Sequence, residues 1–286
     1  MRGAFYVTFG GICLYKLIAI DLDGTLLDDK KDIPRDNLET INLLIEKGYE
    51  IVVATGRRYW SAKELTKKIN GHITIIANNG NIVRNSLNDE LLISKYMDTE
   101  DYKIIIEEGM RRNLHPVIHI DAYNEGIDLI IERGREYGEY VMREGRFKEV
   151  KSFLEIGNEK ILTIVYGDSK KALYPFYEFI SKNYSDNFNI HIMENLDLVE
   201  SMIEIMNPDG NKWKTILEYA SGMDISPEEI ITIGDNNNDI SMIKNSGLGI
   251  AMKNGSDMVK SVAKIITKKD NNESGVAFEL KRVLSI

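Results

Sequence analysis

The hydrophobic residues of this chain gather in short runs that are apolar at nearly every position. The runs are rich in isoleucine and valine, and turn-forming residues bound them. Continuous apolar runs of this length are typical of strands buried on both faces of a parallel sheet. We therefore predict strands at LIAID (17–21), IVVATG (51–56), ITIIANNG (73–80), IITIGD (230–235), GLGIAM (247–252) and KIIT (264–267).

Between these runs, apolar residues recur with the spacing of one helix face. One stripe consists of Leu38, Ile41, Leu44 and Ile45, with Pro34 suited to the first turn and Gly48 to the end. A second stripe consists of Trp213, Ile216, Leu217 and Ala220 and ends at Gly222. Strands that alternate with helices predict an α/β fold with a doubly wound, mostly parallel, Rossmann-like sheet.

The middle of the chain has a different pattern. The candidate strands there are HPVIHIDAY, GIDLIIERG, KILTIVYG and FNIHIM, and helical stripes lie near Ile105 and near Phe176. This pattern predicts a separate α+β domain at residues 84–199, inserted into a core domain made of residues 1–83 and 200–286. We expect two short hinges to connect the two domains.

Composition and charge narrow the classes of partner. The chain has 286 residues and a formal net charge of −9, from 45 acidic and 36 basic residues. Nucleic acid and anionic membranes require a basic surface, so we expect neither as a partner. Cys13 is the only cysteine, which excludes an intrachain disulfide or a cysteine-based zinc site and fits a cytoplasmic location. We expect a monomer or weak homodimer that acts on a small molecule.

The first residues do not fit the strand and helix pattern. MRGAFYVTFGGIC is apolar but too short to span a membrane, and we expect residues 1–13 to be a non-native or disordered extension. Our hypothesis is that translation of the natural chain starts at Leu14, from a TTG codon. A signal peptide that ends near Cys13 is the alternative.

Polar residues follow the predicted core strands directly. They are Asp21 and Asp23 after the first strand, Thr55 and Gly56 after the second, Asn78 and Asn79 after the third, and Asp235 through Asp239 after the fourth. Ligands bind at the carboxyl ends of the strands in an open α/β sheet, so we expect these groups to converge on one edge. Because the spacing of Asp21 and Asp23 matches the period of a strand, both side chains are expected to face one cleft.

Such a cluster suits phosphoryl chemistry. Crowded carboxylates repel one another unless a cation or a shared proton neutralises them, and oxygen ligands suit Mg²⁺. A carboxylate is also a competent nucleophile toward phosphorus. Lys212 is the best candidate for a cation that stabilises the phosphoryl oxygens, and Thr55 with the amide of Gly56 would hold another oxygen.

Four segments identify a family. DLDGTLLDD, VVATGR, GNKWKTIL and GDNNNDISM resemble, in order and spacing, the four motifs of the haloacid dehalogenase superfamily, and in particular its Cof-type phosphatases. The resemblance covers nearly the whole chain after Leu14. It implies a Mg²⁺-dependent hydrolase of small phosphate monoesters, such as sugar or cofactor phosphates. It also implies that the inserted domain is a cap that closes over the cleft and selects the substrate.

The resemblance assigns roles to individual residues. Asp21 resembles the nucleophile that becomes phosphorylated, and Asp23 resembles the general acid and base. Thr55, Gly56, Lys212 and Asn238 correspond to phosphate-binding positions, and Asp239, together with Asn238, to positions that orient the metal and the lysine. Asp21, Asp235 and the backbone carbonyl of Asp23 correspond to the metal ligands. Arg57 and Asn79 are weaker candidates for contact with the substrate.

The sequence leaves alternatives open. Lys214 competes with Lys212 for the motif position, although the spacing favours Lys212. Taken singly, Thr55 reads as a helix cap and Lys212 as a solvated lysine. A phosphotransferase or phosphomutase acting on sugar phosphates, or a non-catalytic sensor of a phosphorylated metabolite, would use many of the same residues.

Overall fold

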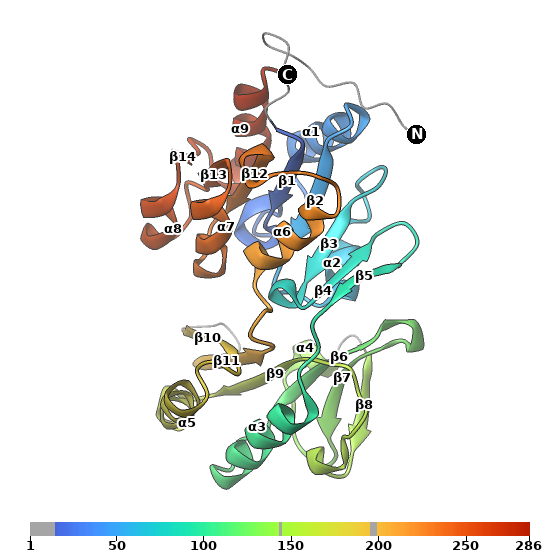
Figure 1. The fold of residues 1–286 in the computed structure, drawn as a ribbon, viewed down its shortest axis with the longest axis vertical. Helices are drawn as coiled ribbons and strands as arrows, with labels where there is room; N and C mark the ends of the chain where they lie inside the picture. The colour runs from blue at the N-terminus through green and yellow to red at the C-terminus, as the bar shows by residue number, and fades with distance from the viewer. Residues whose placement is uncertain (1–14, 143–144, 195–198) are drawn as a thin grey trace. The chain divides into compact units, whose positions relative to one another are not determined.

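The computed structural model describes residues 15–142, 145–194 and 199–286. The hypothesis about residues 1–13 therefore lies outside the described residues. The chain folds into two compact units. One comprises the chain up to Ser94 together with Asn211–Ile286, and the other is Lys95–Gly210. In Figure 1 the first unit combines the blue to cyan and the orange to red segments, so the second unit is an insertion.

The first unit contains an eight-stranded sheet with the order β14-β13-β12-β1-β2-β3-β4-β5. Neighbouring strands from β14 to β3 run parallel. β4 pairs antiparallel with β3, and β5 pairs antiparallel with β4. The strands are β1 (Leu17–Ile20), β2 (Glu50–Ala54), β3 (Thr74–Ala77), β4 (Ile82–Asn85), β5 (Leu91–Ser94), β12 (Ile230–Gly234), β13 (Leu248–Ala251) and β14 (Ile265–Ile266). The predicted α/β class and parallel core sheet are confirmed.

Helices bury both faces of this sheet. Leu17 and Ala19 pack in one apolar cluster with residues of α6, α7 and α8, such as Ile216. The alternate residues Ile18 and Ile20 are also fully buried, which is why the run LIAI is apolar at every position. The helices of this unit are α1 (Arg35–Glu46), α2 (Tyr59–Thr66), α6 (Lys212–Ser221), α7 (Ile240–Asn245), α8 (Asp257–Val262) and α9 (Gly275–Leu284).

The inserted unit has its own sheet and core. Its six strands have the order β10-β11-β9-β6-β7-β8, and all pairs are antiparallel except β7 with β8. Its elements are α3 (Thr99–Arg111), β6 (Val117–Ala122), β7 (Ile127–Glu132), α4 (Glu139–Met142), β8 (Phe147–Val150), β9 (Ile161–Asp168), α5 (Lys170–Asn183), β10 (Asn189–Glu194) and β11 (Ser201–Met206). Tyr166 and Phe176 pack edge to face within its core. No helix among the described segments has the length and apolar character to cross a membrane.

The inserted unit begins and ends later in the chain than predicted. It spans residues 95–210, whereas the sequence pattern placed it at 84–199. At the first boundary, β4 and β5 extend the core sheet from β3. At the second boundary, β11 pairs with β9 and β10 of the insertion. Strand pairing, which a local pattern does not reveal, decides both boundaries.

Candidate active site

Four neighbouring strands of the core sheet deliver the polar residues predicted for the site. Asp21 follows β1, Thr55 follows β2, Asn78 follows β3 and Asp235 follows β12. These strands have the order β12-β1-β2-β3 and run parallel, so their carboxyl ends lie at one edge of the sheet. The convergence expected from the strand pattern is therefore present in the fold.

Three carboxylates meet at this edge. Asp21, Asp235 and Asp239 each offer an oxygen, and these oxygens all lie within 4.8 Å of one another. Asp21 and Asp239 are buried. Backbone N–H groups fix Asp239, because its Oδ2 accepts from Asp235 at 3.0 Å and from Asn236 at 3.1 Å. The backbone of the loop after β12 thus holds the carboxylate of Asp239 in place.

Lys212 joins two of these carboxylates. Its Nζ lies 2.6 Å from Oδ1 of Asp21 and 2.7 Å from Oδ1 of Asp239, and the lysine side chain is 1% exposed. It is the first residue of α6, which Asn211 caps by accepting from the N–H groups of Trp213 and Lys214. Lys214 is exposed, so the geometry favours Lys212 over its rival.

Burial and mutual repulsion perturb the titration of this cluster. Burial, followed by the charge of Asp239, raises the pKa of Asp21 well above its usual range despite the opposing effect of Lys212. The same two causes raise the pKa of Asp235 to about 6. Burial would lower the pKa of Lys212, but Asp21 and Asp239 outweigh it and raise that pKa. One ammonium group therefore does not fully balance the three carboxylates.

The cluster fits a magnesium ion. Closely spaced carboxylate oxygens are hard ligands, and a divalent cation would offset the repulsion that raises the pKa values of Asp21 and Asp235. Lys212 and two backbone N–H groups already bind Asp239. Asp21 and Asp235 are therefore the carboxylates best suited to hold the metal.

The turn after Asp21 packs closely against Asp235. Gly24 has φ +73°, and a Cβ added there would lie 2.5 Å from Oδ2 of Asp235. The Thr25 hydroxyl donates to Oδ1 of Asp235 at 2.9 Å, and the amide of Asn254 donates to the carbonyl of Gly24 at 2.8 Å. Thr25 and Asn254 were not among the predicted site residues, although both lie within motifs visible in the sequence.

The other predicted phosphate-binding residues, Thr55, Gly56 and Asn238, form a second group. Thr55 is buried, and its Oγ1 accepts from the N–H of Arg57 at 3.1 Å. A Cβ on Gly56 would lie 3.2 Å from Oδ1 of Asn79, and this same oxygen accepts from the amide of Asn238 at 3.0 Å. The loops after β2, β3 and β12 therefore lie against one another.

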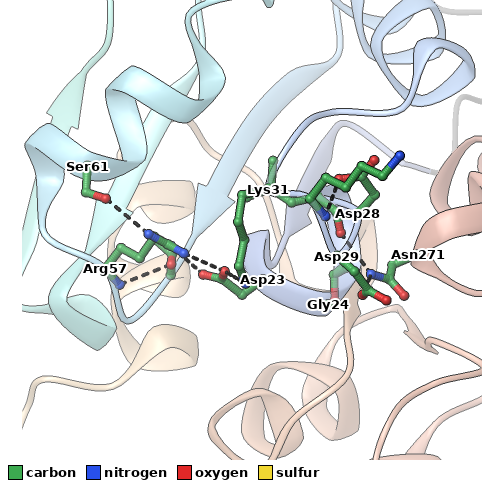
Figure 2. Close-up of polar contacts among 12 residues, drawn as sticks. Asp23, Gly24, Asp28, Asp29, Lys31, Arg57, Ser61 and Asn271 are labelled. Carbon is green, nitrogen blue, oxygen red and sulfur yellow. Dashed lines mark hydrogen bonds and ion pairs between the residues drawn. The ribbon is translucent and has the colours of Figure 1, made fainter. Parts of the chain in front are cut away.

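The side chain of Asp23 has contacts of its own. Its side chain is not part of the carboxylate cluster, whose third member is Asp239. Arg57 binds Asp23 with two hydrogen bonds, Nε to Oδ2 at 2.5 Å and Nη2 to Oδ1 at 2.7 Å, and Lys31 Nζ lies 2.8 Å from Oδ1. Figure 2 shows these two cations reaching Asp23 from different sides.

Two effects of opposite sign act on the Asp23 carboxyl. Burial raises its pKa, but the hydrogen bonds and charge of Arg57, followed by those of Lys31, outweigh burial and lower the pKa to about 2. Asp23 is therefore ionised here at neutral pH. Sequence reasoning missed Lys31, because a lysine in the charged run DDKKD carries no signal of its own.

The chain is similar to known proteins over nearly its whole length. A family model for haloacid dehalogenase-like hydrolases matches residues 18–280. The chain is 28% identical to the 5-amino-6-(5-phospho-D-ribitylamino)uracil phosphatase YcsE of Bacillus subtilis, over 92% of this chain and 93% of that protein. It is 24% identical to the pyridoxal phosphate phosphatase YbhA of Escherichia coli, over 92% of this chain and 97% of that protein.

A solved structure extends the similarity to the fold. The crystal structure of a haloacid dehalogenase-like hydrolase from Bacteroides thetaiotaomicron has a TM-score of 0.79 and 26% identity, and the match covers 94% of this chain and 99% of that one. The family model spans nearly the whole chain, and it agrees with the family predicted from the four motifs. The chain therefore belongs to the haloacid dehalogenase-like hydrolases.

Proposed function

We propose that this protein is a Mg²⁺-dependent phosphatase that hydrolyses small organic phosphate monoesters through a phosphorylated Asp21. The observation that carries the proposal is the buried Lys212, whose Nζ bridges Asp21 and Asp239 beside Asp235. An ammonium held in this position keeps a carboxylate oriented for attack and stabilises the charge on phosphoryl oxygens.

The proposed reaction has two steps. Asp21 attacks phosphorus, the bond from phosphorus to the ester oxygen breaks, and Asp23 gives that oxygen a proton. Asp23 then removes a proton from water, which attacks the phosphoryl group and releases inorganic phosphate and free Asp21. Asp23 is ionised in this structure, so the first step requires it to take up a proton and part from Arg57.

The residues that would bind the phosphate come from separate loops. Thr55 and the amide of Gly56 would bind one oxygen, and Lys212 and Asn238 would lie beside others. Asp21, Asp235 and the backbone carbonyl of Asp23 would hold Mg²⁺, with Asp239 orienting Lys212. When bound, the ion would neutralise the carboxylates and part of the charge on the phosphate.

The family and the relatives support a proposal for the substrate class. The names of two relatives specify a phosphorylated ribityl compound and pyridoxal phosphate. We accordingly propose sugar phosphates or cofactor phosphates, with the inserted unit acting as a cap that selects among them. Arg57 and Asn79 remain candidates for substrate contact. The expected setting is the cytoplasm, for which the support is the single cysteine of the sequence.

The test is phosphate release from a panel of sugar, nucleotide and cofactor phosphates, with Mg²⁺ and with EDTA. Wild type should release phosphate only with Mg²⁺. The phosphatase activity of Asp21→Asn should be lower by about 10³-fold or more, while an unchanged circular dichroism spectrum shows that the variant is folded. Substantial activity of Asp21→Asn would remove Asp21 from the nucleophile role. Formation of a new sugar phosphate after a sugar acceptor is added, with little free phosphate, would favour a phosphotransferase, and no reaction with any ester would favour a sensor.

A further inference from the structure

A tight turn at residues 28–32 follows the loop that carries Asp21 and Asp23. The carboxylate of Asp28 closes this turn, because its Oδ1 accepts from the N–H groups of Lys30 and Asp32, each at 2.9 Å. The N–H of Lys31 donates to the carbonyl of Asp28 at 3.0 Å. Lys31 has φ +63°, a left-handed conformation that is uncommon for a residue other than glycine. The turn therefore fixes the direction of the Lys31 side chain.

The loop before α9 anchors this turn to the core. Asn271 donates to Oδ1 of Asp29 at 3.0 Å, and Asn272 donates to Oδ2 at 3.0 Å. The N–H of Asp29 returns a hydrogen bond to Asn272 at 3.1 Å. Asn271 is buried and also donates to the carbonyl of Leu27. Figure 2 shows Asn271 beside Asp29, with the turn that carries Lys31 next to it.

Lys31 reaches from this anchored turn to the carboxylate of Asp23. Arg57 already binds both oxygens of that carboxylate, and its Nη1 also donates to Ser61 at 3.2 Å. Two cations therefore share one carboxylate. The turn also contains the acidic residues Asp28, Asp29 and Asp32, and two side-chain amides bind the oxygens of Asp29. Asp23 thus has two cationic partners, and the Lys31 side chain is 52% exposed, so a solute can reach its ammonium group.

We propose that Lys31 is a specificity-determining residue that favours phosphate esters with a second anionic group close to the ester oxygen. The inference rests on the proposed function, in which the ester oxygen lies within hydrogen-bonding distance, about 3 Å, of Asp23. Lys31 Nζ is 2.8 Å from the same carboxylate, so it lies beside the first atoms of the leaving group. A carboxylate or second phosphate there can accept from Lys31, as Asp23 does now.

A matched pair of small esters tests this preference. Glycerol 2-phosphate and 2-phosphoglycerate have the same carbon skeleton. One hydroxymethyl group of glycerol 2-phosphate is a carboxylate in 2-phosphoglycerate. Their inhibition constants are measured against the hydrolysis of p-nitrophenyl phosphate with Mg²⁺, which requires neither ester to be turned over. We expect wild type to bind 2-phosphoglycerate about tenfold or more tightly than glycerol 2-phosphate, a ratio equivalent to about 1.4 kcal/mol.

Variants of the same turn separate charge recognition from structure. Lys31→Met should reduce the preference for 2-phosphoglycerate over glycerol 2-phosphate about tenfold, mainly by weakening the binding of 2-phosphoglycerate. Lys31→Arg should retain most of this preference. Lys30→Met removes an exposed neighbouring charge from the same turn and should leave the preference unchanged. A merely structural role for Lys31 would change both inhibition constants together.

The possible results separate the two proposals. If p-nitrophenyl phosphate is hydrolysed and wild type does not discriminate between the two esters, the inference about Lys31 is wrong and the phosphatase stands. An unchanged preference in Lys31→Met, or an equal loss in Lys30→Met, would overturn it as well. If Mg²⁺-dependent hydrolysis of p-nitrophenyl phosphate is absent, the proposed function fails and the inference falls with it.

Discussion

Replacing Lys212 with methionine tests the electrostatic design of the site most directly. Methionine keeps an unbranched side chain of similar length but removes the ammonium that lies 2.6 Å from Asp21 and 2.7 Å from Asp239. The side chains of all three residues are at most 8% exposed, so water cannot replace the lost contacts without rearrangement. The variant leaves a group of buried carboxylates without their cation.

The magnitude follows from this burial. Removing one partner of a buried ion pair costs about 3–5 kcal/mol, because the remaining charge stays buried and unpaired. Near pH 8 without metal we expect Lys212→Met to lose that much unfolding free energy. The loss of unfolding free energy should be smaller near pH 5. The pKa values of Asp21 and Asp235 are already raised and lie higher still without the lysine, so protons neutralise these carboxylates at that pH.

The assay can be confined to the core unit. The chain has two tryptophans, Trp60 on α2 and Trp213 on α6, and both lie in the unit that contains the site. Urea denaturation followed by tryptophan fluorescence therefore reports the unfolding of that unit. Lys214→Met, at an exposed position of the same helix, is the matched control and should cost less than about 1 kcal/mol.

Two results would refute this reasoning. One is a loss below about 1 kcal/mol for Lys212→Met near pH 8, which would mean that the carboxylates do not depend on the lysine. The other is an equal loss near pH 5 and pH 8, which would mean that protonation does not relieve the cluster. The double variant Lys212→Met with Asp239→Asn should lose less than the sum of the two single changes, because the residues are in contact.

Two further predictions concern protons at the site. Asp23→Asn should slow hydrolysis of alkyl phosphates by about 10²–10⁴-fold and that of p-nitrophenyl phosphate much less, since nitrophenolate leaves without a proton; equal losses would exclude Asp23 as the acid. Because the folded-state pKa of Asp235 is raised to about 6, the stability that it contributes when protonated is lost as pH rises through that value. Mg²⁺ should therefore raise the melting temperature more near pH 8 than near pH 5, and a larger shift near pH 5 would contradict the metal assignment to Asp235.

The sequence predicted the parallel core well, because strands buried on both faces must be apolar at every position. The strands that it missed lack this property. In β5, Leu91 and Leu92 are exposed at the edge of the sheet, and in β11 the polar Glu204 interrupts the apolar residues. Local pattern could not assign these strands to their sheets, so both boundaries of the inserted unit were placed too early.

The prediction of the site has a similar limit. Parallel strands bring their carboxyl ends together whatever the side chains do, and the convergence of Asp21, Thr55 and Asp235 was therefore predictable from the strand pattern. The contact of Asp23 with Lys31 depends instead on the left-handed backbone of Lys31. Asn271, which lies 242 residues beyond Asp29, helps to fix that turn. Motif spacing indicates where the phosphate would bind. The proposed charge selection next to the leaving group depends instead on the conformation of the turn at residues 28–32, and Lys31→Met examines that dependence.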